Sequence, residues 1–188
     1  MIKLTDTEII ESVKRGNQSD FSILIDRHKN KAFSLLKRML KNEMEAEEVL
    51  QDCYLKAYKA LSNFKGEAKF STWFYRIVYN TALTRLSTKK RKIEIEMASI
   101  DDHNYLTSDF DIHPGEKDAM VKLVNNLINK LPQKNAAVIS LFYLDGMSCE
   151  EIGEIMKLTA NNVKILLYRS RNILKDIIVE NNLVEELR

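Results

Sequence analysis

Glycine and proline are scarce in this chain, with five glycines and two prolines among 188 residues. The hairpin signal Asn-Gly is absent, so the sequence does not predict a sheet of short strands. Apolar residues instead recur every three or four positions along most of the chain, which is the spacing of amphipathic helices. The sequence therefore predicts an all-α protein.

Cysteine is also rare, since only Cys53 and Cys149 occur and they lie far apart. Neither has a second cysteine or a histidine at ligand spacing, so no zinc motif or disulfide framework is predicted. We expect a reducing, cytoplasmic compartment and neither a metal nor a cofactor.

Long apolar runs are missing as well. No stretch approaches the roughly 20 apolar residues of a membrane span, and the opening "MIKLTDTEII" lacks the features of a signal peptide. No glycine-rich phosphate loop occurs, and His28, His103 and His113 have no triad or ligand context, so an enzyme is not predicted. The net charge is only +2, so any basic surface must come from local clustering.

Helical periodicity divides the chain into two domains, residues 1–92 and 116–188. Between them, residues 93–115 hold six acidic side chains followed by His-Pro-Gly, which predicts a flexible acidic linker. The helices expected in the first domain are Thr5–Arg15, one from about Ser19, one from an Asn42 cap with Glu45 as capping-box partner to about Leu61, and one from a Ser71 or Thr72 cap to Lys92.

The stretch "GMSCEEIGEIMKLTANNVKILLYRSR", residues 146–171, predicts two short helices. A preceding helix should open at Pro132 and end at Asp145–Gly146. Ser148 and Glu151 form a capping box, "KLT" is the joint, and the second helix is apolar on one face and polar and basic on the other. This pattern matches a helix-turn-helix, whose second helix lies in the major groove. The candidate duplex contacts are Ala160, Asn161, Asn162, Lys164, Arg169 and Arg171. Taken alone, the segment fits a merely solvated helix face equally well.

The helix "STWFYRIVYNTALTRLSTKKRK" interleaves aromatic and basic residues. Trp73, Arg76 and Asn80 share one face and Tyr75 lies beside it, an arrangement that suits stacking on unpaired bases. Phe70, Phe74, Ile77 and Val78 are expected in the core, and Trp73 fits the core equally well.

These motifs occur in a fixed order: "AEEVLQDCYLKAYKAL", a loop with "NFKG", "FSTWFYRIVYN", a basic cluster, an acidic linker, "LP" and the helix pair. In this order the chain resembles the extracytoplasmic-function (ECF) sigma factors of bacterial RNA polymerase. The resemblance implies that the basic helix reads the promoter −35 element and the aromatic helix the −10 element. It also implies that the loop Ser62–Phe70 captures a flipped base through Asn63, Phe64, Lys65 and Gly66. Phe64 is equally an anchor that holds this loop on the core.

The same resemblance implies the partners. Glu48, Gln51 and Asp52 would dock on the coiled coil of the polymerase's largest subunit, with further contact to the flap, and promoter DNA and an anti-sigma factor would be the other partners. The chain departs from the common family pattern at four places: Gly153 in place of Ala, Lys157 in place of Gly, Asn161–Asn162 in place of Gly-Thr, and Leu166 in place of Arg. We therefore expect a different −35 preference and a strained left-handed turn at Lys157.

Two alternatives remain open from the sequence. One is a dimeric helix-turn-helix regulator that binds duplex operators without polymerase, and the other is a helical adaptor with no nucleic-acid role. Retention by core RNA polymerase in a pull-down separates the sigma factor from both.

Overall fold

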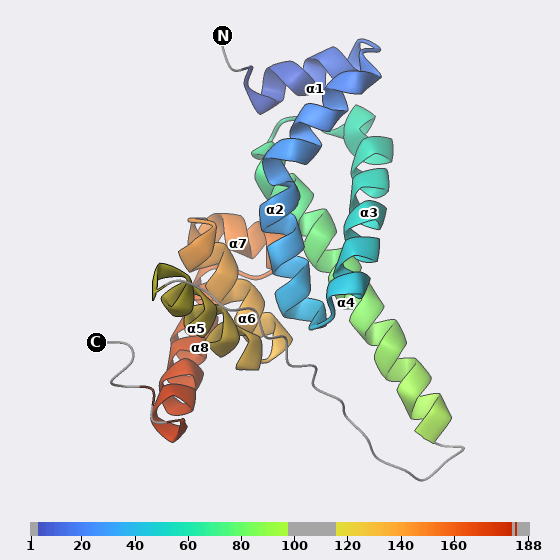
Figure 1. The fold of residues 1–188 in the computed structure, drawn as a ribbon. Coiled ribbons are helices and arrows are strands. Elements are labelled where there is room, and N and C mark those ends of the chain that lie inside the picture. Colours follow the sequence, from blue (N-terminus) through green and yellow to red (C-terminus); the bar gives the residue numbers. More distant parts are fainter. Residues whose placement is uncertain (1–3, 98–115, 182, 184–188) are drawn as a thin grey trace.

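The computed structural model describes residues 4–97, 116–181 and 183, and all regular elements among them are helical. The N-terminal domain contains α1 (Asp6–Lys14), η1 (Gln18–Asp20), α2 (Phe21–Leu40), α3 (Glu43–Ala60), η2 (Leu61–Asn63) and α4 (Phe70–Met97). The C-terminal domain contains α5 (Glu116–Lys130), α6 (Gln133–Ile139), η3 (Ser140–Leu144), α7 (Cys149–Met156) and α8 (Ala160–Glu180). Figure 1 shows the two helical domains side by side. The predicted all-α, two-domain architecture is confirmed.

The start of α3 confirms one prediction and corrects another. Asn42 caps the helix as predicted, because its Oδ1 accepts a hydrogen bond from the Glu45 N–H at 2.9 Å. The Glu45 side chain, however, does not return to the cap. It pairs with Arg85 at 3.0 Å and Lys89 at 3.3 Å, and both of these residues belong to α4. The expected capping box is therefore replaced by ion pairs that link α3 to α4.

The bounds predicted for α4 were wrong at both ends. The helix begins at Phe70, before the expected caps, and the Trp73 N–H donates to the Lys69 carbonyl at 3.1 Å. Thr72 is buried inside the helix rather than capping it. At the other end α4 continues to Met97, so residues 93–97 are helical rather than part of a linker. The rest of the predicted linker, 98–115, lies outside the described residues.

The cores follow the apolar stripes of the sequence. In the N-terminal domain α2, α3 and α4 pack on one another, and Val49, Cys53 and Ala57 are buried as their helical spacing predicted. Burial of the Cys53 thiol raises its pKa to about 11. In the C-terminal domain α8 packs on α5, α6 and α7. Pro132 precedes α6 by one residue rather than opening it.

The two domains also touch each other, since α6 contacts α2 and α7 contacts α4. The Arg38 guanidinium donates to the Asn125 side-chain oxygen at 2.8 Å. Lys31 lies 3.7 Å from Asp145, whose side chain is only 8% exposed. Burial raises the pKa of Asp145, against the lowering effect of Lys31 and Arg38. The buried residues of both domains consequently form one continuous cluster.

Candidate nucleic-acid interface

The helix pair α7–α8 has the local geometry that the sequence predicts. The Ser148 N–H donates to the Glu151 carboxylate at 2.9 Å, and the Glu151 N–H donates to the Ser148 hydroxyl at 3.2 Å. These capping hydrogen bonds, together with Lys69, lower the pKa of Glu151. Thr159 caps α8 by accepting from the Asn162 N–H at 3.2 Å. The predicted capping box and the start of the second helix are therefore confirmed.

The joint between the two helices depends on Gly153. A Cβ at this position would lie 2.6 Å from the Leu158 carbonyl oxygen, which is too close for any side chain. Lys157 ends α7 in a left-handed conformation with φ 57° and ψ 47°, as expected. Such a backbone costs a non-glycine residue about 1 kcal/mol or more. Glycine therefore occupies position 153 inside α7, where a Cβ has no space. The joint itself carries Lys157, whose left-handed backbone is strained.

The outer face of α8 is polar and open. Asn161, Asn162, Lys164 and Arg169 are exposed, and the Tyr168 side chain is 60% exposed. Ala160 is half-buried at the start of the helix. Val163, Leu167 and Ser170 on the opposite face are buried, so the core fixes the orientation of the outer face. This arrangement can enter a major groove without rearrangement of the domain.

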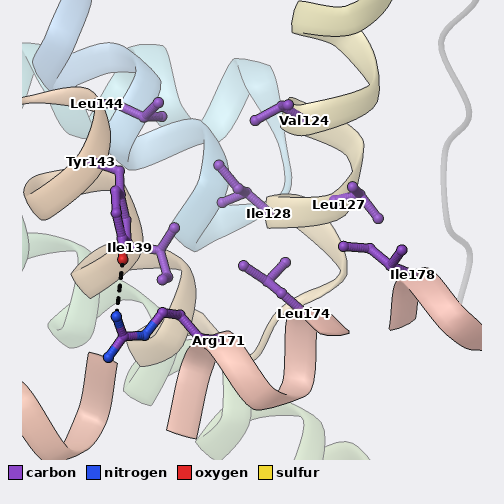
Figure 2. A pocket seen from close by; sticks show the side chains of 9 residues that line it. All are labelled: Val124, Leu127, Ile128, Ile139, Tyr143, Leu144, Arg171, Leu174 and Ile178. Atoms are coloured by element: carbon purple, nitrogen blue, oxygen red, sulfur yellow. Dashed lines mark hydrogen bonds between the residues drawn. The ribbon is translucent and has the colours of Figure 1, made fainter. Parts of the chain in front are cut away.

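Arg171 is exposed at the end of that row of candidates, three residues after Tyr168. Its guanidinium donates to the Tyr143 hydroxyl at 3.4 Å, and it borders an apolar groove of about 310 Å³ (Figure 2). The other lining side chains come from α5, α6, η3 and α8: Val124, Leu127, Ile128, Ile139, Leu144, Leu174 and Ile178. The position of Arg171 on α8 does not by itself predict the contact with Tyr143.

A second hollow brings together most of the residues predicted for the −10 strand. Its volume is about 460 Å³. Six of the eight candidates line it, together with Glu67, Ala68, Thr72 and Glu154: Asn63, Phe64, Lys65, Gly66, Trp73 and Arg76. We call this hollow the loop pocket. It joins aromatic rings, a side-chain amide and cations around one space, which is the composition that suits an unpaired base.

Phe64 both lines the loop pocket and holds the loop in place. Its ring centroid lies 5.1 Å from that of Trp73 and 6.1 Å from that of Phe70. The Lys14 ammonium donates to the Phe64 carbonyl at 2.6 Å, which ties the loop to α1. Gly66 adopts φ 77°, a left-handed conformation that suits glycine. The anchoring role left open by the sequence is therefore present, in a residue that also lines the loop pocket.

Tyr75 and Asn80 do not reach the loop pocket. Tyr75 is 1% exposed, and burial raises the pKa of its hydroxyl. The prediction that Tyr75 is available to DNA is therefore contradicted. Tyr75, Val78, Tyr79 and Ala82 are all buried at spacings of three, four and seven residues, which is a core stripe that the aromatic composition concealed. Asn80 is half-buried, and its carbonyl accepts from the Thr84 hydroxyl at 2.9 Å.

Four lining residues were not among the candidates: Glu67 and Ala68, which belong to the predicted loop, and Thr72 and Glu154, which lie outside it. Thr72 lies one helical turn before Arg76 on the same face of α4. Its spacing from Arg76 could therefore have predicted that it lines the pocket. Glu154 belongs to α7 in the other domain, and no sequence pattern indicates that it reaches this loop. The pocket is thus built by both domains.

The predicted docking residues lie on the exposed side of α3. Gln51 and Asp52 are exposed, whereas Glu48 forms an ion pair with Arg85. Met44 and Leu55 are 81% and 59% exposed, and their spacing places them on the same side of the helix. These two apolar side chains were missed, although apolar positions on a charged helix face are a recognisable signal of a contact surface.

Within residues 4–97, 116–181 and 183, no helix is both long and apolar enough to cross a membrane. In the same described part of the chain, no three His, Cys, Asp or Glu side chains are grouped so that they could hold a metal ion.

Comparison with known proteins identifies both halves of the chain. Residues 24–92 match the model of Sigma-70 region 2, and residues 122–174 match that of Sigma-70 region 4. The chain is 34% identical to the ECF RNA polymerase sigma factor SigW of Bacillus subtilis over 174 residues, which covers 88% of this chain and 92% of SigW. It is 32% identical to the ECF RNA polymerase sigma-E factor of Escherichia coli strain K12 over 176 residues, covering 90% and 92% of the two chains.

Solved structures agree on the fold. The sigma factor RpoE of Bartonella quintana, in complex with the anti-sigma factor NepR, is 18% identical with a TM-score of 0.69, covering 85% of this chain and 96% of RpoE. CnrH, in complex with the cytosolic domain of CnrY, is 20% identical with a TM-score of 0.65, covering 92% and 96%. The chain belongs to the ECF sigma factors of the sigma-70 family, which direct promoter-specific transcription initiation by bacterial RNA polymerase.

Proposed function

We propose that the two domains divide promoter recognition between two faces. The outer face of α8 reads the −35 element as duplex, chiefly through Asn161 and Asn162, because amide side chains can donate to and accept from an adenine edge at the same time. Lys164 and Arg169 then neutralise backbone phosphates and fix the register of the helix. The altered residues at the start of α8 give this chain its own −35 preference.

The observation that carries the second half of the proposal is the composition of the loop pocket. One unpaired base of the −10 element enters this hollow, where Trp73 and Phe64 offer ring faces and Asn63 offers an amide to its Watson–Crick edge. Lys65 and Arg76 lie where they can follow the adjacent phosphates. Unpairing DNA requires free energy, and the capture of bases outside the stack supplies it.

Docking to polymerase uses surfaces that do not overlap with these two faces. Gln51 and Asp52, with the exposed apolar neighbours Met44 and Leu55, form the contact for the coiled coil of the largest subunit. The apolar groove of Figure 2 forms the contact for the flap. The similar RpoE of Bartonella quintana was solved in complex with the anti-sigma factor NepR, and an anti-sigma factor is a further partner that we propose for this chain. We place the protein in the cytoplasm, without catalytic chemistry of its own.

A permanganate footprint of unpaired thymines on a promoter bound by holoenzyme tests strand capture. Asn63→Ala and Lys65→Ala remove side chains from the loop pocket, and Asn80→Ala removes the amide on the adjacent turn of α4. We expect weaker thymine reactivity in these variants, with −35 duplex binding unchanged. Lys29→Ala is the matched control, because it removes the same charge from an exposed site on α2. A bubble of normal extent in all three variants would place strand capture elsewhere.

A further inference from the structure

Helix α1 precedes the segment that matches Sigma-70 region 2, yet it lies beside the loop that lines the loop pocket. It packs against α2 and against η2, whose last residue, Asn63, is the first residue of the pocket. Ile9 and Ile10 of α1 are buried in the N-terminal core, so the position of the helix is fixed. Its last residue is Lys14, and this residue therefore stands at a fixed place beside the strand-capture site.

The hydrogen bond from Lys14 fixes the backbone at the centre of the loop. The Lys14 ammonium donates to the Phe64 carbonyl at 2.6 Å, across 50 positions of the sequence. At Phe64 the backbone leaves η2 and becomes extended, with ψ 115°, so its carbonyl is not part of a helical hydrogen bond. Asn63 and Lys65, on either side of Phe64, contribute an amide and a cation to the loop pocket. Because each peptide unit is planar, a shift of this carbonyl would move both neighbours.

A second attachment joins the start of α1 to the rings that pack on Phe64. The Asp6 carboxylate lies 2.7 Å from the Arg27 guanidinium and 3.0 Å from the His28 Nε2, both on α2. The centroid of the His28 ring lies 5.4 Å from that of Phe70, which lies 6.1 Å from that of Phe64. The two ends of α1 thus hold the loop in different ways, one through a backbone carbonyl and the other through packed rings.

We propose that Lys14 is a positioning residue for strand capture: it holds the Phe64 carbonyl so that Asn63 and Lys65 face one captured base of the −10 element. Lys14 does not line the pocket and acts through the loop. The proposal rests on the proposed function of the loop pocket and adds the group that sets its geometry. A loosened loop should lose discrimination between bases before it loses affinity, because hydrogen bonds to a base edge depend on direction whereas stacking on a ring tolerates every base.

The first test measures base discrimination by holoenzyme on fork-junction promoter fragments, each carrying one of the four bases at one unpaired position of the −10 element. Asn63→Ala identifies the captured position as the one at which it lowers discrimination. We expect Lys14→Met to lower discrimination at that same position about threefold, the loss of one hydrogen bond. Lys14→Arg should restore it, because a guanidinium also donates. Arg15→Met is the matched control, because it removes a neighbouring positive charge from the exposed end of the same helix.

Hydrogen exchange tests the cause in the protein itself. Mass spectrometry of the peptide that covers residues 62–69 should show exchange about threefold faster in Lys14→Met than in wild type, and wild-type exchange in Lys14→Arg. The peptides of α2 and α3 should exchange as in wild type, since Lys14 is exposed and its loss leaves the core intact. A loop that exchanges no faster in Lys14→Met overturns the positioning role, and so does faster exchange throughout the N-terminal domain.

The dependence of affinity on salt separates positioning from a direct phosphate contact. Lys14→Met should leave the slope of log affinity against log salt unchanged, whereas the loss of a phosphate contact would lower it by about one. A lower slope, unchanged discrimination, or an equal loss at every position of the −10 element overturns the positioning role and leaves the pocket assignment intact. If Asn63→Ala alters discrimination at no position, the pocket assignment fails and the role of Lys14 fails with it.

Discussion

The two faces assigned to promoter DNA differ in what covers them. The polar face of α8 is open, and its orientation is fixed by Val163 and Leu167 in the core beneath it. The loop pocket is walled by Glu154 of the opposite domain and is lined by aromatic rings. Reading duplex DNA requires a rigid polar surface, which is stable in water. Capturing a strand requires apolar rings in a hollow. Another domain of the same chain can cover such a hollow, as the domain that contains Glu154 does here.

The largest effect that would break this comparison is expected from Gly153→Ala. The new Cβ would meet the Leu158 carbonyl at 2.6 Å, and backbone cannot move aside as a side chain does. We expect a loss of about 3 kcal/mol of stability in the C-terminal domain, with loss of −35 duplex binding. Thermal unfolding followed by circular dichroism measures the first effect and a duplex shift assay the second. If the variant melts and binds like wild type, the close joint between α7 and α8 is wrong.

The open face is tested next by Asn161→Ala/Asn162→Ala. Loss of bidentate contacts should reduce discrimination at particular −35 base pairs by about 2 kcal/mol. Arg169→Ala should instead weaken all sequences alike and reduce the dependence of affinity on salt. Holoenzyme binding to a set of single-base promoter variants, at two salt concentrations, separates the two patterns. Arg171→Ala should reduce the affinity and its dependence on salt less than Arg169→Ala does, because the Arg171 guanidinium already donates to the Tyr143 hydroxyl.

The docking surface on α3 provides a third face for comparison. Gln51→Ala/Asp52→Lys changes two exposed side chains, so the fold should be unaffected. We expect binding to core polymerase to weaken by about 1.5 kcal/mol, roughly tenfold. Fluorescence anisotropy of a labelled chain measures this affinity. Glu47→Ala/Lys59→Ala is the control on the same helix, and equal losses in both pairs would argue against a localised docking site.

Cys53 connects the N-terminal core to pH. Its pKa is raised from about 9 to about 11 by burial, so the folded chain retains the proton while the unfolded chain loses it. Stability should therefore fall as the pH rises from 9 to 11, by an amount on the order of 1 kcal/mol. Denaturant unfolding across this range measures the slope, and Cys53→Ala should reduce it at a lower overall stability. Part of the slope should remain near pH 10 and above, because burial also raises the pKa of Tyr54, Tyr75 and Tyr79. Cys149 is less buried, so its thiol should react first with a thiol reagent at neutral pH.

The smallest effect concerns the two left-handed lysines, Lys41 and Lys157, which end α2 and α7. Glycine should relieve strain at either position, and we expect Lys157→Gly to stabilise its domain by up to about 1 kcal/mol. Lys41→Gly is the matched change in the N-terminal domain, and it should leave the open face of α8 unaffected. Differential scanning calorimetry resolves the two changes. Destabilisation by Lys157→Gly would show that its side chain contributes more than its backbone costs.

The sequence was sufficient wherever local chemistry decides the structure. Ser148 with Glu151, Thr159 and Asn42 lie at caps because short polar side chains satisfy free N–H groups of a first turn. The loop pocket was also largely predicted, since most of its residues are close in the chain. The spacing of apolar residues likewise predicted which side of α8 is buried, because this spacing also involves only residues that are close in the chain.

Long-range contacts were not predictable in this way. Glu45 pairs with Arg85 rather than with its cap, because α3 and α4 bring together charges that are 40 residues apart. Tyr75 was misassigned because an aromatic residue suits a core and a DNA face equally by composition. Glu154 at the loop pocket required knowledge of how two domains meet, and no single helix pattern contains that information.

The wide turn η3 has a consequence for insertions and deletions. In this turn the Asp145 N–H donates to the carbonyl of Ser140, five residues earlier, at 3.0 Å. A π-type turn contains one residue more than an α-helical turn needs. Removing a single residue here would let the helix revert to regular winding and rotate everything beyond it by about 100°. Asp145 would then turn away from Lys31, and α7 from α4. The length of this one turn therefore sets the orientation of α7 and everything after it relative to the N-terminal domain.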